Sequence, residues 1–161
     1  MTDREQHAML STMPATPLFY LAADHAGFAL KETVKQVLLL KGVQVEDLTP
    51  VLNEQDDYPL VGVQAAKKML STKNSQAVIL CGTGFGIAIA ANRVVGARAV
   101  VAQQPEDAQM ARSHNHANIL ALGGRTLSPR KVPAILEAWL NTPPDKAARH
   151  TRRVRELDEL V

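Results

Sequence analysis

The single cysteine of this chain, Cys81, lies between an apolar run and a glycine-rich turn. Residues 77–80 are Ala-Val-Ile-Leu, as expected of a strand buried on both faces, and residues 82–86 read Gly-Thr-Gly-Phe-Gly. Glycines let backbone N–H groups approach a ligand closely, and a helix expected at 87–91 would point its N-terminus at the same spot. Such surroundings can bind a phosphate or a developing oxyanion and can activate a thiol, which makes Cys81 a candidate base or nucleophile. The competing interpretation is a tight strand-to-helix turn around a buried, inert cysteine.

Two further groups of residues could move protons or bind a substrate. Asp24 and His25 directly follow a strand-like apolar run. The plainer interpretation is that Asp24 caps the next helix and that His25 is a surface residue. His114 and His116 flank Asn115 and could hold a metal ion, but no second cysteine or acidic cluster has a matching spacing, so zinc is disfavoured. A histidine that interacts favourably with the dipole of a helix C-terminus is the alternative.

Four arginines gather near the C-terminus, in a segment that we expect to be helical from about 145 to 160. Arg152 and Arg155 can each pair with a glutamate four residues further on. Arg149 and Arg153 share a face and have no such partner, which suits a phosphate contact. A nucleic-acid surface is the rival interpretation, but stacking aromatic residues are absent nearby and the net charge is only +2.

The composition and the motifs exclude several classes of protein. The chain has 161 residues, of which 46% are hydrophobic and 21% charged, enough for one globular domain. One cysteine permits no intrachain disulfide, which suits a reducing compartment such as the cytoplasm. No apolar run is long enough to span a membrane, and we expect residues 1–17 to be a disordered N-terminal extension before a single domain at 18–161. The glycine spacing at 82–86 matches neither a Walker loop nor the dinucleotide fingerprint, so a nicotinamide cofactor is disfavoured.

Strand and helix patterns alternate along the whole chain. Strands are expected at 18–23, 43–47, 77–80, 97–102 and 117–122. Helices are expected at about 27–41, from Tyr58 onward, and at 87–91, 105–114, 129–141 and 145–160. The helix that begins at Tyr58 is predicted to bury Leu60, Val61, Ala65, Met69 and Leu70.

This alternation predicts an α/β fold, in which helices cover both faces of a five-stranded parallel sheet and a further helix ends the chain. In such sheets ligands bind beyond the carboxyl ends of the strands, at a switch in strand order. Three of the candidate segments fall at such ends: 24–25, 81–86 and 123–125. His114 and Asn115 lie at the end of a helix that enters the fifth strand, so they fit this rule less well.

Several short motifs occur here in the order found in one enzyme family. They are Asp24-His25-Ala26-Gly27-Phe28, Asp57-Tyr58-Pro59, Cys81-Gly82-Thr83-Gly84-Phe85-Gly86, Ala90-Ala91-Asn92, His114-Asn115, Gly123-Gly124-Arg125, and Arg149-His150 with Arg153-Val154. On these motifs the chain resembles, from about residue 19 to 154, the family of ribose-5-phosphate isomerase B and the galactose-6-phosphate isomerase subunits. The joint occurrence of the first and third motifs is highly specific.

The resemblance implies a Rossmann-like three-layer α/β/α sandwich and an aldose–ketose isomerase that needs no metal or cofactor. It implies a homodimer or homotetramer with shared active sites, whose C-terminal helix packs on or reaches into the partner. Cys81 would take the proton from C2 of ribose 5-phosphate, and a cis-enediolate would lead to ribulose 5-phosphate, a step of the pentose phosphate pathway. The resemblance also implies that His114 opens the sugar ring, that Thr83 contacts the reacting oxygens, and that the amides of Gly82, Gly84, Phe85 and Gly86 bind the enediolate. By the same resemblance Asp24 and Asn115 would bind hydroxyls, and Tyr58 would line the site. The phosphate would be bound by His25, Arg125, Arg149 and Arg153.

Two departures from the family pattern bear on the sugar preference. Thr49 stands where relatives usually have glycine, so we expect the loop after the second strand to run differently. Residues 147–148 are alanines in place of the usual glycines, so we expect the last helix to begin early. The open alternatives are an isomerase of galactose 6-phosphate, allose 6-phosphate or a four-carbon sugar phosphate and, more distantly, a non-catalytic sugar-phosphate-binding protein. Binding alone would require neither Cys81 nor Thr83 nor His114.

Overall fold

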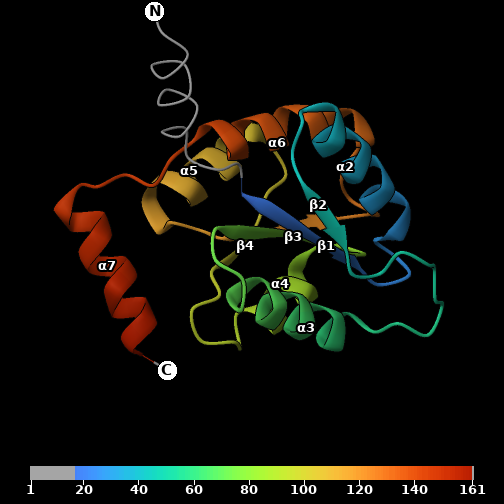
Figure 1. Ribbon diagram of the computed structural model, residues 1–161, viewed down its shortest axis with the longest axis horizontal. Helices are drawn as coiled ribbons and strands as arrows, with labels where there is room; N and C mark the ends of the chain where they lie inside the picture. The colour runs from blue at the N-terminus through green and yellow to red at the C-terminus, as the bar shows by residue number, and fades with distance from the viewer. Residues whose placement is uncertain (1–16, 161) are drawn as a thin grey trace, which may run out of the picture.

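The computed structural model describes residues 17–160, so the extension expected at 1–17 lies outside the described residues except for Pro17. Five strands form one parallel sheet in the order β2-β1-β3-β5-β4 (Figure 1). The strands are β1 (Leu18–Ala23), β2 (Val45–Asp47), β3 (Ser75–Cys81), β4 (Ala99–Val101) and β5 (Ile119–Gly123). The predicted five-stranded parallel sheet is therefore confirmed.

Helices cover both faces of this sheet, as Figure 1 shows. One face carries α2 (Phe28–Leu40), α5 (Pro105–Asn115) and α6 (Val132–Asn141), and the other carries α3 (Tyr58–Leu70) and α4 (Phe85–Ala91). A short 3-10 turn, η1 (Pro129–Lys131), precedes α6, so the helix expected at 129–141 has an irregular first turn. These layers make the predicted three-layer α/β/α sandwich.

The buried run of β3 divides its side chains between the two halves of the core. Val78 and Leu80 pack against the α2, α5 and α6 side, whereas Ala77, Ile79 and Cys81 pack against the α3 and α4 side. This alternation follows from the two-residue period of a strand. A continuous apolar sequence is needed because both faces are covered.

The switch in strand order falls between β1 and β3, which pair along their full length to Ala23 and Leu80. After β1 the chain crosses to α2 on one face of the sheet, and after β3 it crosses to α4 on the other. The two connecting loops therefore diverge at the carboxyl ends of the strands and leave a crevice between them, which is where sheets of this kind bind ligands.

The buried face of α3 differs from the predicted one. Val61, Ala65 and Met69 are buried as expected, but Leu60 and Leu70 are 68% and 39% exposed. Gly62 and Ala66 complete the buried face instead, because α3 packs closely on α4 and small residues let the two helices approach. The prediction was wrong for the two leucines because it assigned every large apolar residue of the helix to its core face.

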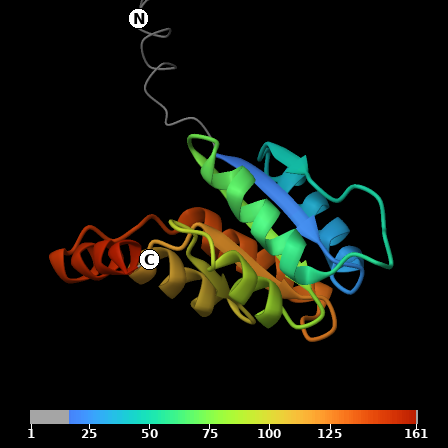
Figure 2. The same cartoon turned by 90° about the horizontal axis from the view of Figure 1, so that it is seen from below.

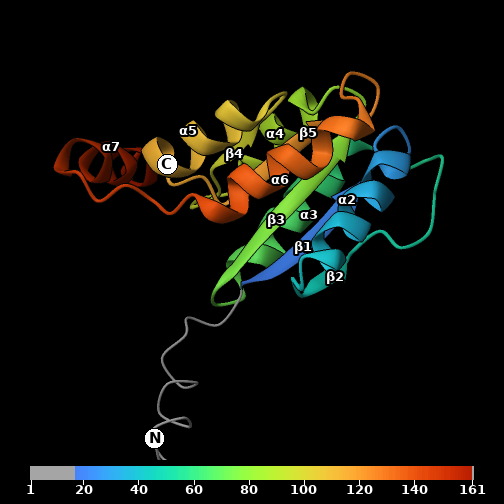
Figure 3. The same cartoon turned by 90° about the horizontal axis from the view of Figure 1, so that it is seen from above.

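The last helix, α7 (Ala148–Glu159), begins three residues later than expected. The Asp145 carboxylate accepts the backbone N–H of Ala147 at 2.9 Å, and Ala147 has an extended ψ of 134°. The alanines therefore do not start the helix early. All three views show α7 standing away from the sheet, beside α5 (Figures 1, 2 and 3). The predicted i, i+4 pairs of Arg152 and Arg155 with their glutamates are confirmed.

Between residues 17 and 160, no helix combines the length and the apolar character that a membrane crossing requires.

Candidate active site

A pocket of about 450 Å³ opens at the carboxyl ends of β1, β3 and β5. Its walls come from the loop after β1, the start of α3, the turn after β3 and the loop after β5. It is lined by Asp24, His25, Ala26, Asp57, Tyr58, Cys81, Gly82, Thr83, Gly86 and Arg125. Eight of these ten residues were predicted as site residues, and they come from four separate segments of the chain.

Cys81 ends β3 and is buried, with 4% of its surface exposed. The backbone N–H of Gly84 folds back toward the sulfur and donates to Sγ at 3.2 Å. Gly84 has a φ of +81°, which favours glycine, and a Cβ there would lie 3.1 Å from the Leu122 carbonyl carbon. An N–H donor aimed at the sulfur stabilises negative charge on it. The turn therefore supplies what a reactive thiolate needs.

The loop after β5 braces this turn through its backbone. Gly124 N–H donates to the Cys81 carbonyl and Arg125 N–H donates to the Gly82 carbonyl, both at 2.8 Å. A Cβ on Gly124 would lie 2.3 Å from the Ala26 carbonyl oxygen, so the loops after β1 and β5 pack backbone against backbone. This contact fixes the backbone from which the Arg125 side chain reaches the pocket.

Asp24 and His25 are both held by backbone groups. One Asp24 carboxylate oxygen accepts the N–H groups of Ala26 and Gly27 at 2.9 Å each, so Asp24 closes the turn before α2 and also lines the pocket. His25 Nδ1 lies 3.2 Å from the Asp56 carbonyl oxygen. Because a carbonyl only accepts, Nδ1 carries a proton in this contact, which leaves Nε2 as the ring atom for other partners.

The loop after β2 is fastened to the end of β1 by a buried lysine. Lys31, fully buried, donates to both Asp47 carboxylate oxygens at 2.9 and 2.7 Å and to the Thr49 carbonyl at 2.6 Å. The Thr49 hydroxyl accepts the N–H of Ala23, the residue before Asp24. Thr49 is not among the described residues with positive φ. The sequence reasoning missed this network, although Lys31 shares the face of α2 that buries Val34 and Leu38, which was the available signal.

Electrostatics at this network favour the charged form of the Asp47 carboxyl group. Burial raises its pKa, but hydrogen bonds from Lys31 and Lys35 outweigh burial and hold the pKa below its ordinary value. Asp47 therefore stays ionised and keeps the loop in place.

Of the other predicted residues, Gly84 and Phe85 lie in the turn beside Cys81, where Phe85 is exposed and begins α4. The last four lie at the opposite end of the molecule. His114 and Asn115 end α5, and Arg149 and Arg153 lie on α7. Because α5 connects two parallel strands, its C-terminal end lies at the edge of the sheet where strands begin, away from Cys81. In every view α7 lies at the left and the 48–57 loop, beside the Cys81 pocket, lies at the right (Figures 1, 2 and 3). One chain therefore does not bring these residues to the thiol.

The two histidines weighed as metal ligands make other contacts. His116 Nε2 bonds to the Asp145 carbonyl oxygen at 2.8 Å, and His114 stacks on His150. Across the described residues 17–160, no three His, Cys, Asp or Glu side chains gather closely enough to hold a metal ion.

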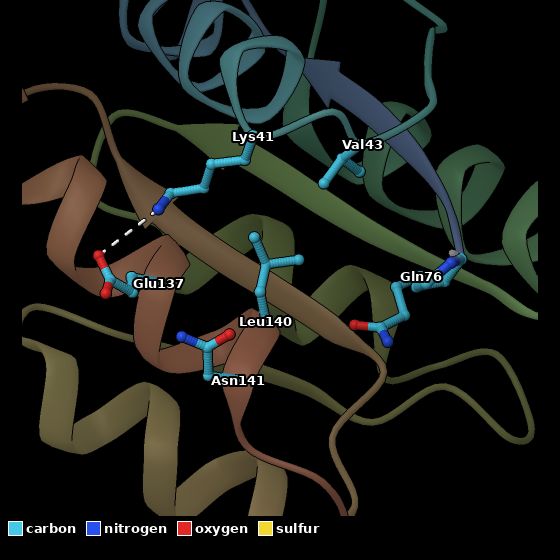
Figure 4. Close-up of a pocket in the computed structure, with 7 residues that line it drawn as sticks. Lys41, Val43, Gln76, Glu137, Leu140 and Asn141 are labelled. Carbon is cyan, nitrogen blue, oxygen red and sulfur yellow. Dashed lines mark hydrogen bonds and ion pairs between the residues drawn. The ribbon is translucent and has the colours of Figure 1, made fainter. Parts of the chain in front are cut away.

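A second cavity, of about 470 Å³, lies where β1 and β3 begin (Figure 4). Lys41 and Glu137 face each other across it at 3.5 Å, and Val43, Gln76, Leu140 and Asn141 complete the walls that Figure 4 labels. It contains neither a thiol nor an imidazole and none of the predicted residues. We therefore assign the candidate active site to the Cys81 pocket.

Comparisons with known proteins show which family the chain belongs to. The family model described as Ribose/Galactose Isomerase matches residues 19–157. Ribose-5-phosphate isomerase B of Mycolicibacterium paratuberculosis is 40% identical over 141 residues, which cover 87% of this chain and 89% of that protein. The D-erythrulose-4-phosphate isomerase of Pectobacterium atrosepticum is 37% identical over 122 residues, covering 75% of this chain and 80% of that protein.

Solved structures show the same fold at similar identity. A ribose 5-phosphate isomerase of Thermotoga maritima has a TM-score of 0.84 and 43% identity, covering 89% of this chain and 99% of that one. Ribose-5-phosphate isomerase B of Mycoplasma genitalium, solved with bound ribulose-5-phosphate, has a TM-score of 0.81 and 30% identity, covering 88% of this chain and 94% of that one.

Proposed function

The chain belongs to the ribose/galactose isomerase family, and on that premise we propose that it interconverts ribose 5-phosphate and ribulose 5-phosphate. One observation carries the proposal. The buried Cys81 thiol lies in one pocket with Asp24, His25, Thr83 and Arg125, at the switch point of the sheet. The pocket volume of about 450 Å³ is in the range of small-molecule sites.

In the proposed reaction Cys81 acts as the base. As a thiolate it takes the proton from C2 of the open-chain aldose, and the electrons of that C–H bond form a C1–C2 double bond while the C1 carbonyl oxygen becomes an oxyanion. Cys81 then delivers this proton to C1, and the proton of the O2 hydroxyl passes to O1, which leaves a hydroxyl at C1 and a ketone at C2. Atoms and electrons balance without an added oxidant. A thiol base must stay reduced, which agrees with the expected cytoplasmic location.

The other residues hold the substrate rather than exchange its carbon-bound proton. We assign the enediolate oxygens to Thr83 and to the amides of 82–86 other than that of Gly84, which donates to the Cys81 sulfur. We assign the phosphate to His25 and Arg125 of the same pocket. A donor cluster of this kind lowers the barrier because it stabilises charge that develops in the transition state. Asp24 is assigned to a sugar hydroxyl.

The residues at the far end of the chain suggest that the site is shared between two copies. We propose a homodimer in which one subunit completes the pocket of the other. His114 of that subunit opens the sugar ring, Asn115 binds a hydroxyl, and Arg149 and Arg153 bind the phosphate together with His25 and Arg125. Two observations support it: these residues lie far from Cys81 in their own chain, and the two helices whose first turns line the pocket, α3 and α4, expose Leu60 and Ile89 by 68% and 67%. Large apolar side chains that are this exposed suit burial against a second chain.

A four-carbon sugar phosphate is the second candidate substrate. The similarity to a D-erythrulose-4-phosphate isomerase over most of the chain favours it. The pocket offers no steric reason to reject a sugar shorter by one carbon, so the substrate panel must decide.

The test is turnover of ribose 5-phosphate in deuterated water with EDTA, followed by NMR, for the native protein and for Cys81→Ala and Cys81→Ser. We expect isomerisation and deuterium incorporation by the native protein, and a loss of at least about a hundredfold in both variants, because a base contributes roughly 10²–10⁴ in rate. Ribitol 5-phosphate, which cannot isomerise, should still bind both variants in a calorimetric titration.

An active Cys81→Ala variant would refute the base assignment. Native protein that converts erythrose 4-phosphate but not ribose 5-phosphate would favour the second candidate. Native protein that binds sugar phosphates without deuterium exchange would make it a binding protein.

A further inference from the structure

Two imidazole rings from different helices stack at the end of the molecule that carries Arg149 and Arg153. His114, at the end of α5, and His150, on α7, have ring centroids 4.5 Å apart and planes inclined by only 3°. His150 is buried, with 6% of its surface exposed, whereas His114 is exposed. The buried ring therefore covers one face of the exposed ring and leaves its other face to solvent.

The nitrogen Nε2 of His150 has a second partner. Arg149 Nε donates to it at 3.2 Å, so in this contact Nε2 holds a lone pair and the ring proton of neutral His150 is on Nδ1. The Asp145 carboxylate, on the segment before α7, lies 3.6 Å from the same nitrogen. His150 thus touches His114 through its face and Arg149 through its edge.

The surrounding charges favour the neutral ring. Burial lowers the pKa of His150 below its ordinary value, and the positive charges of Arg149, His114 and Arg153 lower it further, against the opposing effect of Asp145. Arg149 and Arg153 face it from α7, His114 faces it from α5, and Asp145 faces it from the connecting segment. A neutral ring at neutral pH is what the hydrogen bond from Arg149 requires.

We propose that His150 is a positioning residue for the isomerase: its ring face holds His114 in one orientation, and its Nε2 holds the Arg149 guanidinium. The inference rests on the proposed function, in which His114 opens the sugar ring and Arg149 binds the phosphate. Without His150 each of these exposed side chains would sample several rotamers, and both would have to be ordered when the substrate binds.

Two substitutions separate the two contacts. His150→Phe keeps an aromatic face against His114 but offers Arg149 no acceptor, so we expect KM to rise about fivefold with kcat within about twofold. His150→Gln keeps an acceptor near the position of Nε2 but removes the ring, so we expect kcat to fall about tenfold with KM within about twofold. Arg152→Gln, on the exposed side of the same helix and paired with Glu156, is the matched control and should leave both constants unchanged.

A readout that needs no activity separates this inference from the proposed function. Because stacked aromatic rings shield each other, the ring protons of His114 should resonate upfield in the native protein and in His150→Phe, and should move downfield in His150→Gln. If the native protein isomerises no sugar phosphate, the proposed function fails, and the NMR spectrum still decides whether the stack exists.

Three results would overturn the positioning role. One is an unshifted His114 resonance in the native protein, which remains measurable if a variant does not fold. Another is native kcat and KM in both variants. The third is that both variants change kcat and KM in the same way and lose Tm in parallel. This would mean that His150 serves only to pack α7.

Discussion

Single residues at the proposed site divide into those that meet the reacting carbons and those that meet the phosphate. Cys81 is buried and receives one backbone N–H, so its surroundings are fixed before a substrate arrives. Arg149 and Arg153 are exposed on a helix that stands away from the sheet. Groups that bind a remote phosphate act equally in the ground state and the transition state, whereas the base acts only in the latter.

Replacement of Arg149 by alanine should therefore weaken substrate binding without slowing the chemistry. We expect KM for ribose 5-phosphate to rise about tenfold or more, as for a lost charge-assisted hydrogen bond, with kcat within about twofold. Arg152→Ala is the control, because Arg152 pairs with Glu156. Initial-rate kinetics check this, and a lower kcat at unchanged KM would contradict the phosphate assignment.

At the scale of elements, the pocket depends on how loops are fastened to one another. The Lys31–Asp47 pair joins α2 to the end of β2 and, through Thr49, to the residue that precedes Asp24. Burying such a pair costs desolvation, and removing one member leaves the other charge buried without compensation. The network is thus a structural support for the site, and its failure should appear first in stability.

Asp47→Asn should destabilise the protein by about 2–3 kcal/mol at pH 7, because buried Lys31 would keep only the partly exposed Glu32 carboxylate, 3.0 Å away, as a counter-charge. The folded-state pKa of Asp47 is below its ordinary value, so its stabilising effect is present above about pH 4 and is lost as the pH falls through the folded pKa. The gap between native and variant free energies of unfolding in urea should be equal at pH 7 and 5 and smaller at pH 3.

The exposed ion pair of Glu46 with Lys68 provides the control for this experiment. Glu46→Gln should change stability by less than about 1 kcal/mol at every pH. A gap for Asp47→Asn that does not shrink at pH 3 would mean that the carboxylate charge is not what holds the loop.

At the scale of the whole molecule, the sheet separates the two halves of the proposed site. The carboxyl ends of parallel strands meet at one edge, and the helices between them return the chain to the other. Cys81 therefore lies at one edge, and His114, at the end of such a helix, lies at the other. Two copies in a closed two-fold arrangement can bring one edge of each chain to the opposite edge of its partner.

Complementation between two inactive variants tests this arrangement. Cys81→Ala and His114→Ala should each be nearly inactive, but a mixture co-refolded at equal amounts should regain about a quarter of native activity, because half of the dimers are mixed and each has one intact site of two. Each variant refolded alone is the control. Activity that stays at the level of the separate variants would contradict the shared site.

The sequence by itself determined the helices and strands, the fold class, and the part of the site whose residues come directly after strands. An apolar run that stops at Cys81 and a glycine turn place the thiol at a strand end, and parallel topology then places Asp24 and Arg125 near it. Each of these inferences depends on residue spacing inside one segment or on a general rule for parallel sheets, so no knowledge of remote contacts was needed.

Only the tertiary structure decided which side chains from remote segments meet. The exposure of Leu60, the stack of His150 on His114 and the burial of Lys31 against Asp47 all depend on how separate helices and loops pack. Local spacing cannot encode such contacts, because a side chain's neighbours across elements are fixed by the packing of the whole chain and not by the residues beside it in sequence.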